Sequence, residues 1–176
     1  MRRLLFAFLV FMGMNTAHAA CTGVHDFRFT TLEGNPVDLC NHREQPILVV
    51  NTASQCGFTP QFEKLEAMHK KYHERGLLIV GFPSNDFNQE PAANKEIGDF
   101  CKRNYGVQFP MAEKTSVTGP DANPLYKQLI EATHEPPLWN FHKYLILPNG
   151  KVYAFSSDTS PESPRLMRRL QPYLKK

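Results

Sequence analysis

Several common signatures are missing from this sequence of 176 residues. No two cysteines stand in the C-x-x-C spacing of a thiol–disulfide oxidoreductase, because Thr59 occupies the third position after Cys56. None of the seven histidines lies in a local signature of a cysteine hydrolase. Internal repeats and low-complexity tracts are also absent. The chain is long enough for one domain with a sizeable core and too short for two ordinary ones.

An excess of charge of one sign is missing as well. The sequence has 20 lysines and arginines against 17 aspartates and glutamates, and 41% of its residues are apolar. This composition is normal for a globular protein, and it provides no basic patch that would favour nucleic acid binding.

The first twenty residues have the pattern of a secretory signal peptide. Arg2 and Arg3 precede an apolar run, residues 4–14 (LLFAFLVFMGM), that is too short to cross a membrane as a helix. Ala17-His18-Ala19 then fits an A-x-A cleavage site. We expect a signal peptide of residues 1–20, cleaved after Ala19 or Ala20, export to the periplasm, and no stable membrane insertion.

Two features near the cleavage site leave other routes open. Cys21 could carry a lipid, but His18 stands where a lipobox usually has an apolar residue. The Arg2-Arg3 pair is a weak sign of twin-arginine export. In either case the remaining chain, residues 21–176, is predicted to be one domain.

The first half of that domain reads as hairpin, strand, helix and strand. Phe27 and Phe29 alternate with polar residues before a turn, which predicts a β-hairpin within residues 24–39. The apolar runs 47–50 and 77–82 have the length of buried strands, and apolar residues between them recur at helical spacing from Pro60, with Thr59 as the expected N-cap. A strand, helix and strand in this order form a parallel crossover.

The second half adds helices and a second hairpin. We predict a helix over 94–105 capped by Asn94, a strand-like stretch over 109–114, a short helix over 123–133, strands over 143–147 and 151–155, and a closing helix over 161–174. The order predicts an α/β domain with a thioredoxin-like fold, in which helices flank a central mixed β-sheet and a β-hairpin lies at the N-terminus.

Cys56 lies between a buried strand and the start of a helix. Reactive groups gather beyond the carboxyl ends of strands in open α/β sheets, and backbone N–H groups at a helix start favour an anion. The neighbours Ser54, Gln55 and Gly57 are typical of a loop and not of a core. We therefore predict that Cys56 is a nucleophilic thiolate.

Four blocks that include this cysteine resemble the glutathione peroxidase family. They occur in the family's order and cover nearly the whole of residues 21–176. They are 51–59 (NTASQCGFT), 81–91 (GFPSNDFNQEP), 100–111 with its FC, YGV and FPM motifs, and 139–145 (WNFHKYL). The family fold is thioredoxin-like, in agreement with the order of predicted elements.

The resemblance implies a catalytic group. In the family a cysteine or selenocysteine, a glutamine, a tryptophan and an asparagine act together, and Cys56, Trp139 and Asn140 match three of these positions. Asp86 occupies the glutamine position, where an ionised carboxylate would disfavour a thiolate beside it. Asp86 is therefore protonated, turned away or different in role, and Gln89 is a candidate substitute donor.

The family also implies a reaction cycle without a cofactor. The Cys56 thiolate would reduce hydrogen peroxide or an organic or lipid hydroperoxide to water or an alcohol and become a sulfenic acid. Cys101 matches the resolving cysteine of non-animal members. A thioredoxin-like dithiol or glutathione would then restore the thiols. An assembly loop is missing between residues 133 and 139, as in monomeric members.

Two other functions are compatible with the same fold. A redox sensor or binding protein with little turnover is favoured by Asp86, which departs from the catalytic pattern. A disulfide oxidoreductase is disfavoured by the missing C-x-x-C spacing.

The remaining cysteines, Cys21 and Cys40, flank the predicted N-terminal hairpin. A hairpin brings its flanks together, and an exported protein folds where thiols tend to pair. A bond between them is one outcome, and two free thiols or a lipidated Cys21 are the others.

Overall fold

The computed structural model describes residues 21–176, so the predicted signal peptide lies outside the described residues. Four strands form the central sheet in the order β4-β3-β5-β6. β3 pairs parallel with β4 and antiparallel with β5, and β5 pairs antiparallel with β6. Their bounds are β3 Ile47–Thr52, β4 Leu78–Pro83, β5 Lys143–Ile146 and β6 Val152–Phe155. This is the mixed sheet that the sequence predicts.

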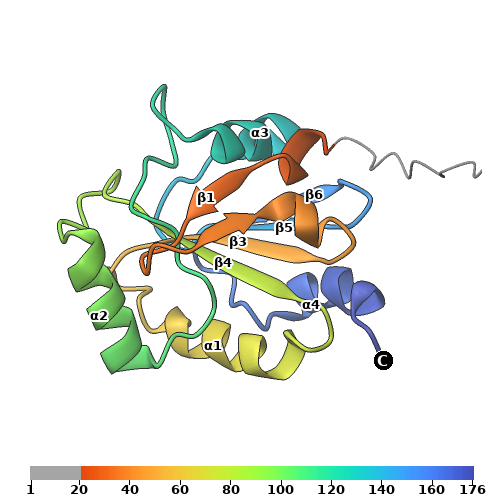
Figure 1. Ribbon diagram of the computed structural model, residues 1–176, viewed down its shortest axis with the longest axis horizontal. Helices are drawn as coiled ribbons and strands as arrows, with labels where there is room; N and C mark the ends of the chain where they lie inside the picture. The colour runs from red at the N-terminus through yellow and green to blue at the C-terminus, as the bar shows by residue number, and fades with distance from the viewer. Residues whose placement is uncertain (1–20) are drawn as a thin grey trace, which may run out of the picture.

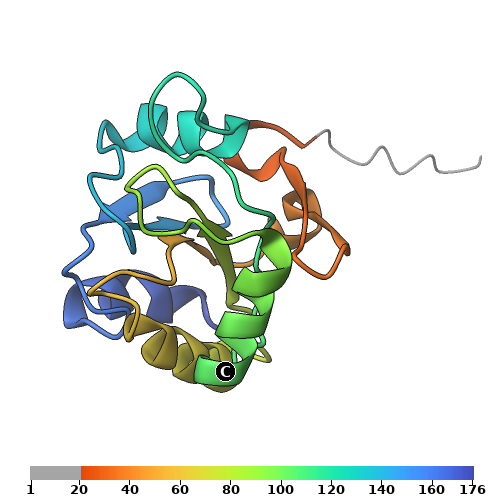
Figure 2. The same ribbon diagram turned by 90° about the vertical axis from the view of Figure 1, so that its left-hand side faces the viewer.

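The sheet carries helices on both faces (Figures 1 and 2). Every residue of β3 is buried, which is why its first four residues, 47–50, form a continuous apolar run. Leu48 and Val50 pack on one face among residues of α1 (Gln61–Tyr72) and α4 (Pro164–Leu170). Ile47 and Val49 pack on the opposite face among residues of α3 (Pro124–Thr133). The period of two along the strand thus divides the apolar side chains between two cores.

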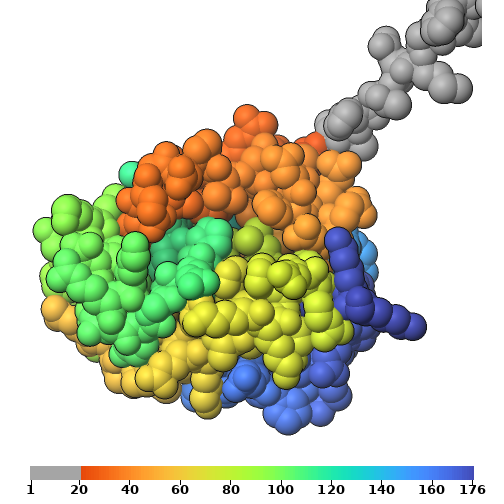
Figure 3. All heavy atoms as spheres, turned by 60° about the horizontal axis from the view of Figure 1, so that its bottom comes forward, coloured from red at the N-terminus to blue at the C-terminus, as the bar shows by residue number. Residues whose placement is uncertain are grey.

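Helix α2 (Asn94–Tyr105) lies beside α1 at one end of the sheet (Figures 1 and 3). It ends at Gly106, whose φ of 61° lies in the left-handed region. The N–H of Gly106 donates to the carbonyls of Cys101 and Lys102, a common way to end a helix. Ile97 and Cys101 are the buried residues of α2, so one stripe of this helix faces the core.

The N-terminal hairpin forms as predicted, from β1 (Arg28–Thr30) and β2 (Pro36–Asp38). The stretch 109–114 does not become a strand and makes only isolated bridges, from Ala112 to Thr31 and from Met111 to Gly81. Pro110 has no N–H to donate, which interrupts any regular ladder there. These bridges still join the hairpin to β4.

Two predicted helix caps are wrong. Pro60, not Thr59, immediately precedes α1, and the Thr59 hydroxyl is used inside the preceding loop. Asn94 is the first residue of α2, and its Oδ1 accepts a hydrogen bond from the Lys114 N–H at 2.9 Å. In both cases the polar side chain that was expected to cap the helix forms its hydrogen bond with a residue outside the helix.

The closing helix is shorter than predicted. Ser163 caps α4, its hydroxyl accepting from the Leu166 N–H, and the helix ends at Leu170. A 3-10 turn, η3 (Gln171–Tyr173), follows because Pro172 lacks the N–H that would extend the α-helix. Two further 3-10 turns, η1 (Gly23–His25) and η2 (Leu39–His42), flank the hairpin. Within residues 21–176, no helix has both the length and the apolar character needed to cross a membrane.

A disulfide joins Cys21 and Cys40, with Cα atoms 5.8 Å apart. Of the outcomes left open by the sequence, the pairing across the hairpin flanks is therefore confirmed. Cys56 and Cys101 are free. The bond fastens residue 21, which otherwise begins the described chain with only the short turn η1 to hold it.

Replacing both bonded cysteines, Cys21→Ser with Cys40→Ser, should lower the free energy of unfolding by about 3 kcal/mol, because the disulfide closes a loop of 19 residues in the unfolded chain. Urea denaturation measures the difference. The unsubstituted protein in excess reductant serves as the control and should lose a similar amount. Alkylation of both cysteines in the untreated protein would show instead that the bond is absent.

Candidate active site

Cys56 sits in a tight series of turns between β3 and α1. Its side chain is buried, with 8% exposed, and its Sγ accepts a hydrogen bond from the Phe58 N–H at 3.3 Å. The Cys56 N–H donates to Thr59 Oγ1 at 3.1 Å, and the Thr59 hydroxyl donates to the Ala53 carbonyl at 3.0 Å. The residue where a C-x-x-C protein has its second thiol therefore holds the loop in shape. An N–H directed at the sulfur favours its negatively charged form.

The segment before β5 brings Trp139 and Asn140 to the same end of the sheet. Asn51, in β3, donates from its Nδ2 to the Trp139 carbonyl at 3.1 Å, and its own carbonyl accepts from the Phe141 N–H at 2.6 Å. Phe141 has a φ of 63°, unusual for a bulky residue. Its ring packs on Phe62 of α1 with centroids 5.3 Å apart, so core packing holds this turn in place.

Trp139 is 41% exposed, and its ring lies 5.5 Å from that of Phe87. The side chain of Phe58, whose N–H reaches the Cys56 sulfur, lines the same surface hollow as Trp139. The structure thus brings the indole to the neighbourhood of the cysteine loop. An exposed indole on this edge is unusual, because tryptophan side chains are mostly buried.

Asn140 is fully buried and donates from Nδ2 to Gln89 Oε1 at 2.9 Å. The Gln89 carbonyl in turn accepts from the Gln55 N–H at 3.0 Å, one residue before Cys56. Gln89, the substitute donor suggested by the sequence, therefore connects the asparagine to the cysteine loop. Asn140 Oδ1 is buried and has no protein partner.

Glu90 is a residue whose role the sequence did not reveal. It is 1% exposed, and its carboxylate accepts from the Ser54 N–H at 2.8 Å and from the Ser54 hydroxyl at 2.7 Å. Burial raises the pKa of Glu90, while the two Ser54 hydrogen bonds and the charge of Lys114 oppose that rise. In the sequence, Glu90 is one residue of the second block, 81–91, and nothing there indicates that it is buried beside the cysteine loop.

Asp86 is turned away from the cysteine loop. Its Oδ2 accepts from the Val117 N–H at 2.7 Å and from the Thr118 N–H at 3.0 Å. Of the three alternatives left open by the sequence, this geometry matches a carboxylate that points elsewhere. Its hydrogen bonds join the loop after β4 to the segment before α3.

Cys101 lies on the buried stripe of α2 and is 3% exposed. It belongs to the same apolar cluster as Cys56, although the two are not bonded. Burial, with smaller contributions from the charges of Glu90 and Glu33, raises the pKa of Cys101 to about 12. At neutral pH it is therefore a thiol and not a thiolate.

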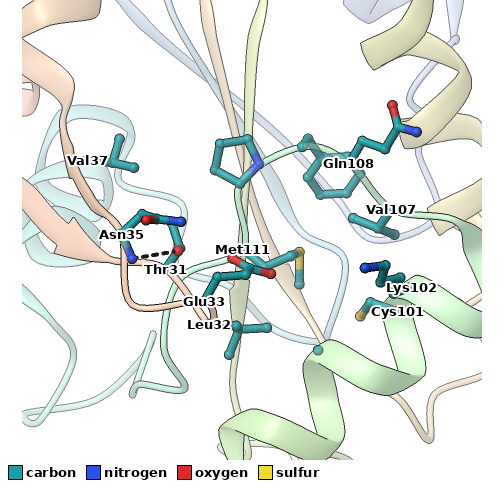
Figure 4. Close-up of a pocket in the computed structure, with 13 residues that line it drawn as sticks. Thr31, Leu32, Glu33, Asn35, Val37, Cys101, Lys102, Val107, Gln108 and Met111 are labelled. Atoms are coloured by element: carbon teal, nitrogen blue, oxygen red, sulfur yellow. Dashed lines mark hydrogen bonds between the residues drawn. The ribbon is translucent and has the colours of Figure 1, made fainter.

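A hollow of about 280 Å³ lies next to Cys101 (Figure 4). Residues of the N-terminal hairpin line one side, Cys101 and Val107 line the other, and Met111 lies between them. The hairpin that the disulfide fastens is thus also the neighbour of the second free cysteine.

No group of three metal-binding side chains occurs within residues 21–176.

The fold and this arrangement of thiols define a thiol-based oxidoreductase. The family model described as "Glutathione peroxidase" matches residues 24–130. The chain belongs to the glutathione peroxidase family, and its activity is that of a thiol peroxidase, as predicted from the four blocks.

Curated relatives cover most of this chain. The glutathione peroxidase-like peroxiredoxin gpx1 of Schizosaccharomyces pombe is 46% identical over 136 residues, which are 74% of this chain and 86% of the relative. The hydroperoxy fatty acid reductase gpx1 of Synechocystis sp. is 43% identical, with 78% of this chain and 87% of the relative covered. Glutathione peroxidase 7 of Bos taurus is 39% identical and covers 88% of this chain and 89% of itself.

Solved structures agree with the fold. T. cruzi GPX1 aligns with a TM-score of 0.66 at 29% identity, covering 86% of this chain and 96% of that one. Trgpx in apo form also has a TM-score of 0.66, at 33% identity, covering 87% and 96% of the two chains. The predicted thioredoxin-like fold with its N-terminal hairpin is therefore confirmed.

The position of the Asp86 carboxylate has a testable consequence. Asp86→Asn should leave the midpoint of Cys56 alkylation against pH unchanged, because the carboxylate bonds to residues 117 and 118. It should instead lower the free energy of unfolding by about 1–3 kcal/mol, since two hydrogen bonds to a charged group are weakened. A shifted alkylation midpoint in a folded variant would mean that Asp86 does act on the Cys56 sulfur.

Proposed function

We propose that Cys56 is the residue that reacts with hydroperoxide in this thiol peroxidase. The observation that carries the proposal is the Phe58 N–H directed at the Cys56 sulfur in the loop after β3. Asn140 and Trp139 come to the same end of the sheet through Asn51 and Gln89. Amide and indole N–H groups can donate to a negatively charged sulfur, or to the oxygen that leaves it.

The first step transfers one oxygen atom. The Cys56 thiolate attacks the terminal oxygen of a hydroperoxide, the O–O bond breaks, and Cys56 becomes a sulfenic acid. The departing alkoxide or hydroxide takes a proton from solvent and leaves as an alcohol or water. Sulfur is oxidised and the peroxide is reduced, so this step requires no cofactor.

We assign the second step to Cys101. Its thiol sulfur attacks the Cys56 sulfenic acid, a sulfur–sulfur bond forms, and the leaving hydroxide with the thiol proton gives water. Cys101 is buried on α2 and is not bonded to Cys56, so we expect the helix to open locally before the bond forms. A dithiol of the thioredoxin type then reduces the disulfide by exchange, and glutathione is the alternative reductant.

Three further proposals concern the whole protein. Export to the periplasm rests on the sequence of residues 1–20, and the Cys21–Cys40 bond suits an oxidising compartment. An intact N-terminus in protein purified from its source would contradict cleavage after Ala19 or Ala20. A monomer rests on the short segment before Trp139, and sedimentation as a dimer would contradict it. The reductant is identified by comparing turnover with a thioredoxin-like protein and with glutathione.

Cys56→Ser should reduce peroxide consumption by about 10³-fold or more, because a hydroxyl cannot replace the thiolate as nucleophile. Steady-state kinetics with hydrogen peroxide measures the loss. Circular dichroism and the unfolding midpoint must match those of the unsubstituted protein. A folded variant that keeps substantial turnover would overturn the assignment of Cys56.

Cys101→Ser should preserve the first oxidation and prevent its resolution. After one equivalent of peroxide, mass mapping should find a Cys56–Cys101 bond in the unsubstituted protein and a sulfenic acid at Cys56 in the variant. Turnover with a dithiol protein should fall by about tenfold or more, while sulfinic acid at Cys56 accumulates. Finding only over-oxidised Cys56 in the unsubstituted protein would show that Cys101 is not the resolving thiol.

A further inference from the structure

An apolar hollow of about 480 Å³ opens beside Trp139. This volume is within the range of small-molecule sites, whereas the hollow next to Cys101 is about 280 Å³. The segment before β5 contributes Pro136, Leu138 and Trp139 to its wall, and Phe58 comes from the cysteine loop. The hollow thus begins two residues from Cys56 in sequence, on the side where Phe58 donates to the sulfur.

The rim of this hollow is exceptionally apolar for this surface. Within residues 21–176, three large apolar side chains are exposed: Leu138 at 81%, Trp139 at 41% and Tyr173 at 38%. Leu138 and Trp139 are neighbours on the rim, whereas Tyr173 lies near the C-terminus and does not line the hollow. Exposed apolar surface costs free energy in water, and its concentration at one hollow marks a binding site.

The charges around the hollow are acidic. Glu135 and Asp158 line it, and no lysine or arginine does. Lys143 is a fully buried lysine whose Nζ donates to the carbonyl of Ser157, a lining residue, and to that of Thr159. Burial lowers the pKa of Lys143 to about 7, so it offsets at most one of the two carboxylates at neutral pH.

His142, which also lines the hollow, adds no positive charge at neutral pH. His142 is 5% exposed, and burial lowers its pKa to about 4, so its ring is neutral. Its Nε2 is buried without a protein partner. His134 is exposed at the rim, where solvent surrounds it.

We propose that this hollow binds the uncharged hydrocarbon part of an organic hydroperoxide and that Glu135 and Asp158 select against substrates carrying a carboxylate. The proposal rests on the proposed function, because it places the peroxide group of the same substrate at Cys56. The apolar wall provides affinity for the hydrocarbon, and the two acids repel an anion that comes near it. The preferred substrates are therefore neutral alkyl, aryl or ester hydroperoxides and not free fatty acid hydroperoxides.

This selectivity would distinguish the chain from a relative to which it is similar. The Synechocystis protein is named a hydroperoxy fatty acid reductase, which describes that protein's substrate as an acid. In this chain, reduction by the same kind of thiol chemistry is expected to favour the ester of a fatty acid hydroperoxide over the free acid. Glu135 and Asp158 are the residues of this chain that would make the difference.

The test compares kcat/KM of the purified protein for hydrogen peroxide, cumene hydroperoxide, linoleic acid hydroperoxide and the methyl ester of that hydroperoxide. Leu138→Asn should lower the ratio of cumene hydroperoxide to hydrogen peroxide by about fivefold, through KM for the organic substrate, because part of an apolar contact is lost. Tyr173→Asn, which alters an exposed aromatic ring outside the hollow, is the matched control and should leave the ratio unchanged.

The charge component has its own experiment. The unsubstituted protein should prefer the ester to the free acid by about threefold or more, and added salt should narrow that preference by screening. Glu135→Gln with Asp158→Asn should narrow it as well. Equal use of acid and ester at low salt, or a preference that ignores both substitutions, would overturn the selection against carboxylates.

Other occupants of the hollow would give different results. If Leu138→Asn raises KM for the dithiol reductant and leaves the ratio of peroxides unchanged, the surface docks the reductant and the inference is wrong. If the variant changes the oligomeric state, a second copy occupies the hollow, and the inference is again wrong. If the unsubstituted protein consumes no peroxide of any kind, the proposed function itself fails.

Discussion

The position of β3 between two partners is the constraint on which the active site depends. Its carboxyl end is fixed by β4 on one side and β5 on the other. Because β4 runs parallel, the loop that follows it, with Gln89 and Glu90, emerges at the end where the Cys56 loop begins. Because β5 runs antiparallel, the segment that precedes it, with Trp139 and Asn140, arrives at that same end. Strand direction alone therefore brings three distant segments together.

Polar side chains then fix these segments to one another. Glu90 holds Ser54, Gln89 holds both Gln55 and Asn140, and Asn51 holds the turn before Phe141. Each contact joins two of these three segments. Burying such groups costs free energy unless each is satisfied, so these hydrogen bonds specify one arrangement of the loops. The geometry around the sulfur is thus set by the neighbours of the cysteine more than by the cysteine itself.

The sequence predicted those features that depend on local patterns. The apolar run 47–50 at the start of β3 and the helical spacing of α1 each determine their element from local sequence. Thr59 and Asn94 were misassigned as caps because their side chains found better partners in the folded chain, at Ala53 and Lys114. No spacing rule could foresee these choices, since they depend on which loops meet in space.

The site shows the same division. Cys56, Trp139 and Asn140 were proposed from motifs, whereas the direction of the Asp86 carboxylate and the burial of Glu90 depend on how the chain folds. Asp86 illustrates the physical reason: the residue type at a catalytic position does not determine where its side chain points when two backbone N–H groups of residues 117 and 118 compete for it. Asp86, which departs from the catalytic pattern in the sequence, makes a contact between two loops in the fold.

In the proposed cycle, burial of Cys101 sets the order of the two chemical steps. Burial raises the pKa of Cys101 to about 12, so at neutral pH its thiolate is much scarcer than that of an exposed cysteine. The buried thiol is thus a poor nucleophile while α2 is intact, and it cannot interfere with the attack of Cys56 on a peroxide. Local opening of α2 would expose Cys101 to water, which would remove the main cause of its raised pKa and restore its reactivity. If Cys101 resolves the Cys56 sulfenic acid as proposed, opening of α2 controls that step: the movement that brings the Cys101 sulfur toward Cys56 would also make it able to react.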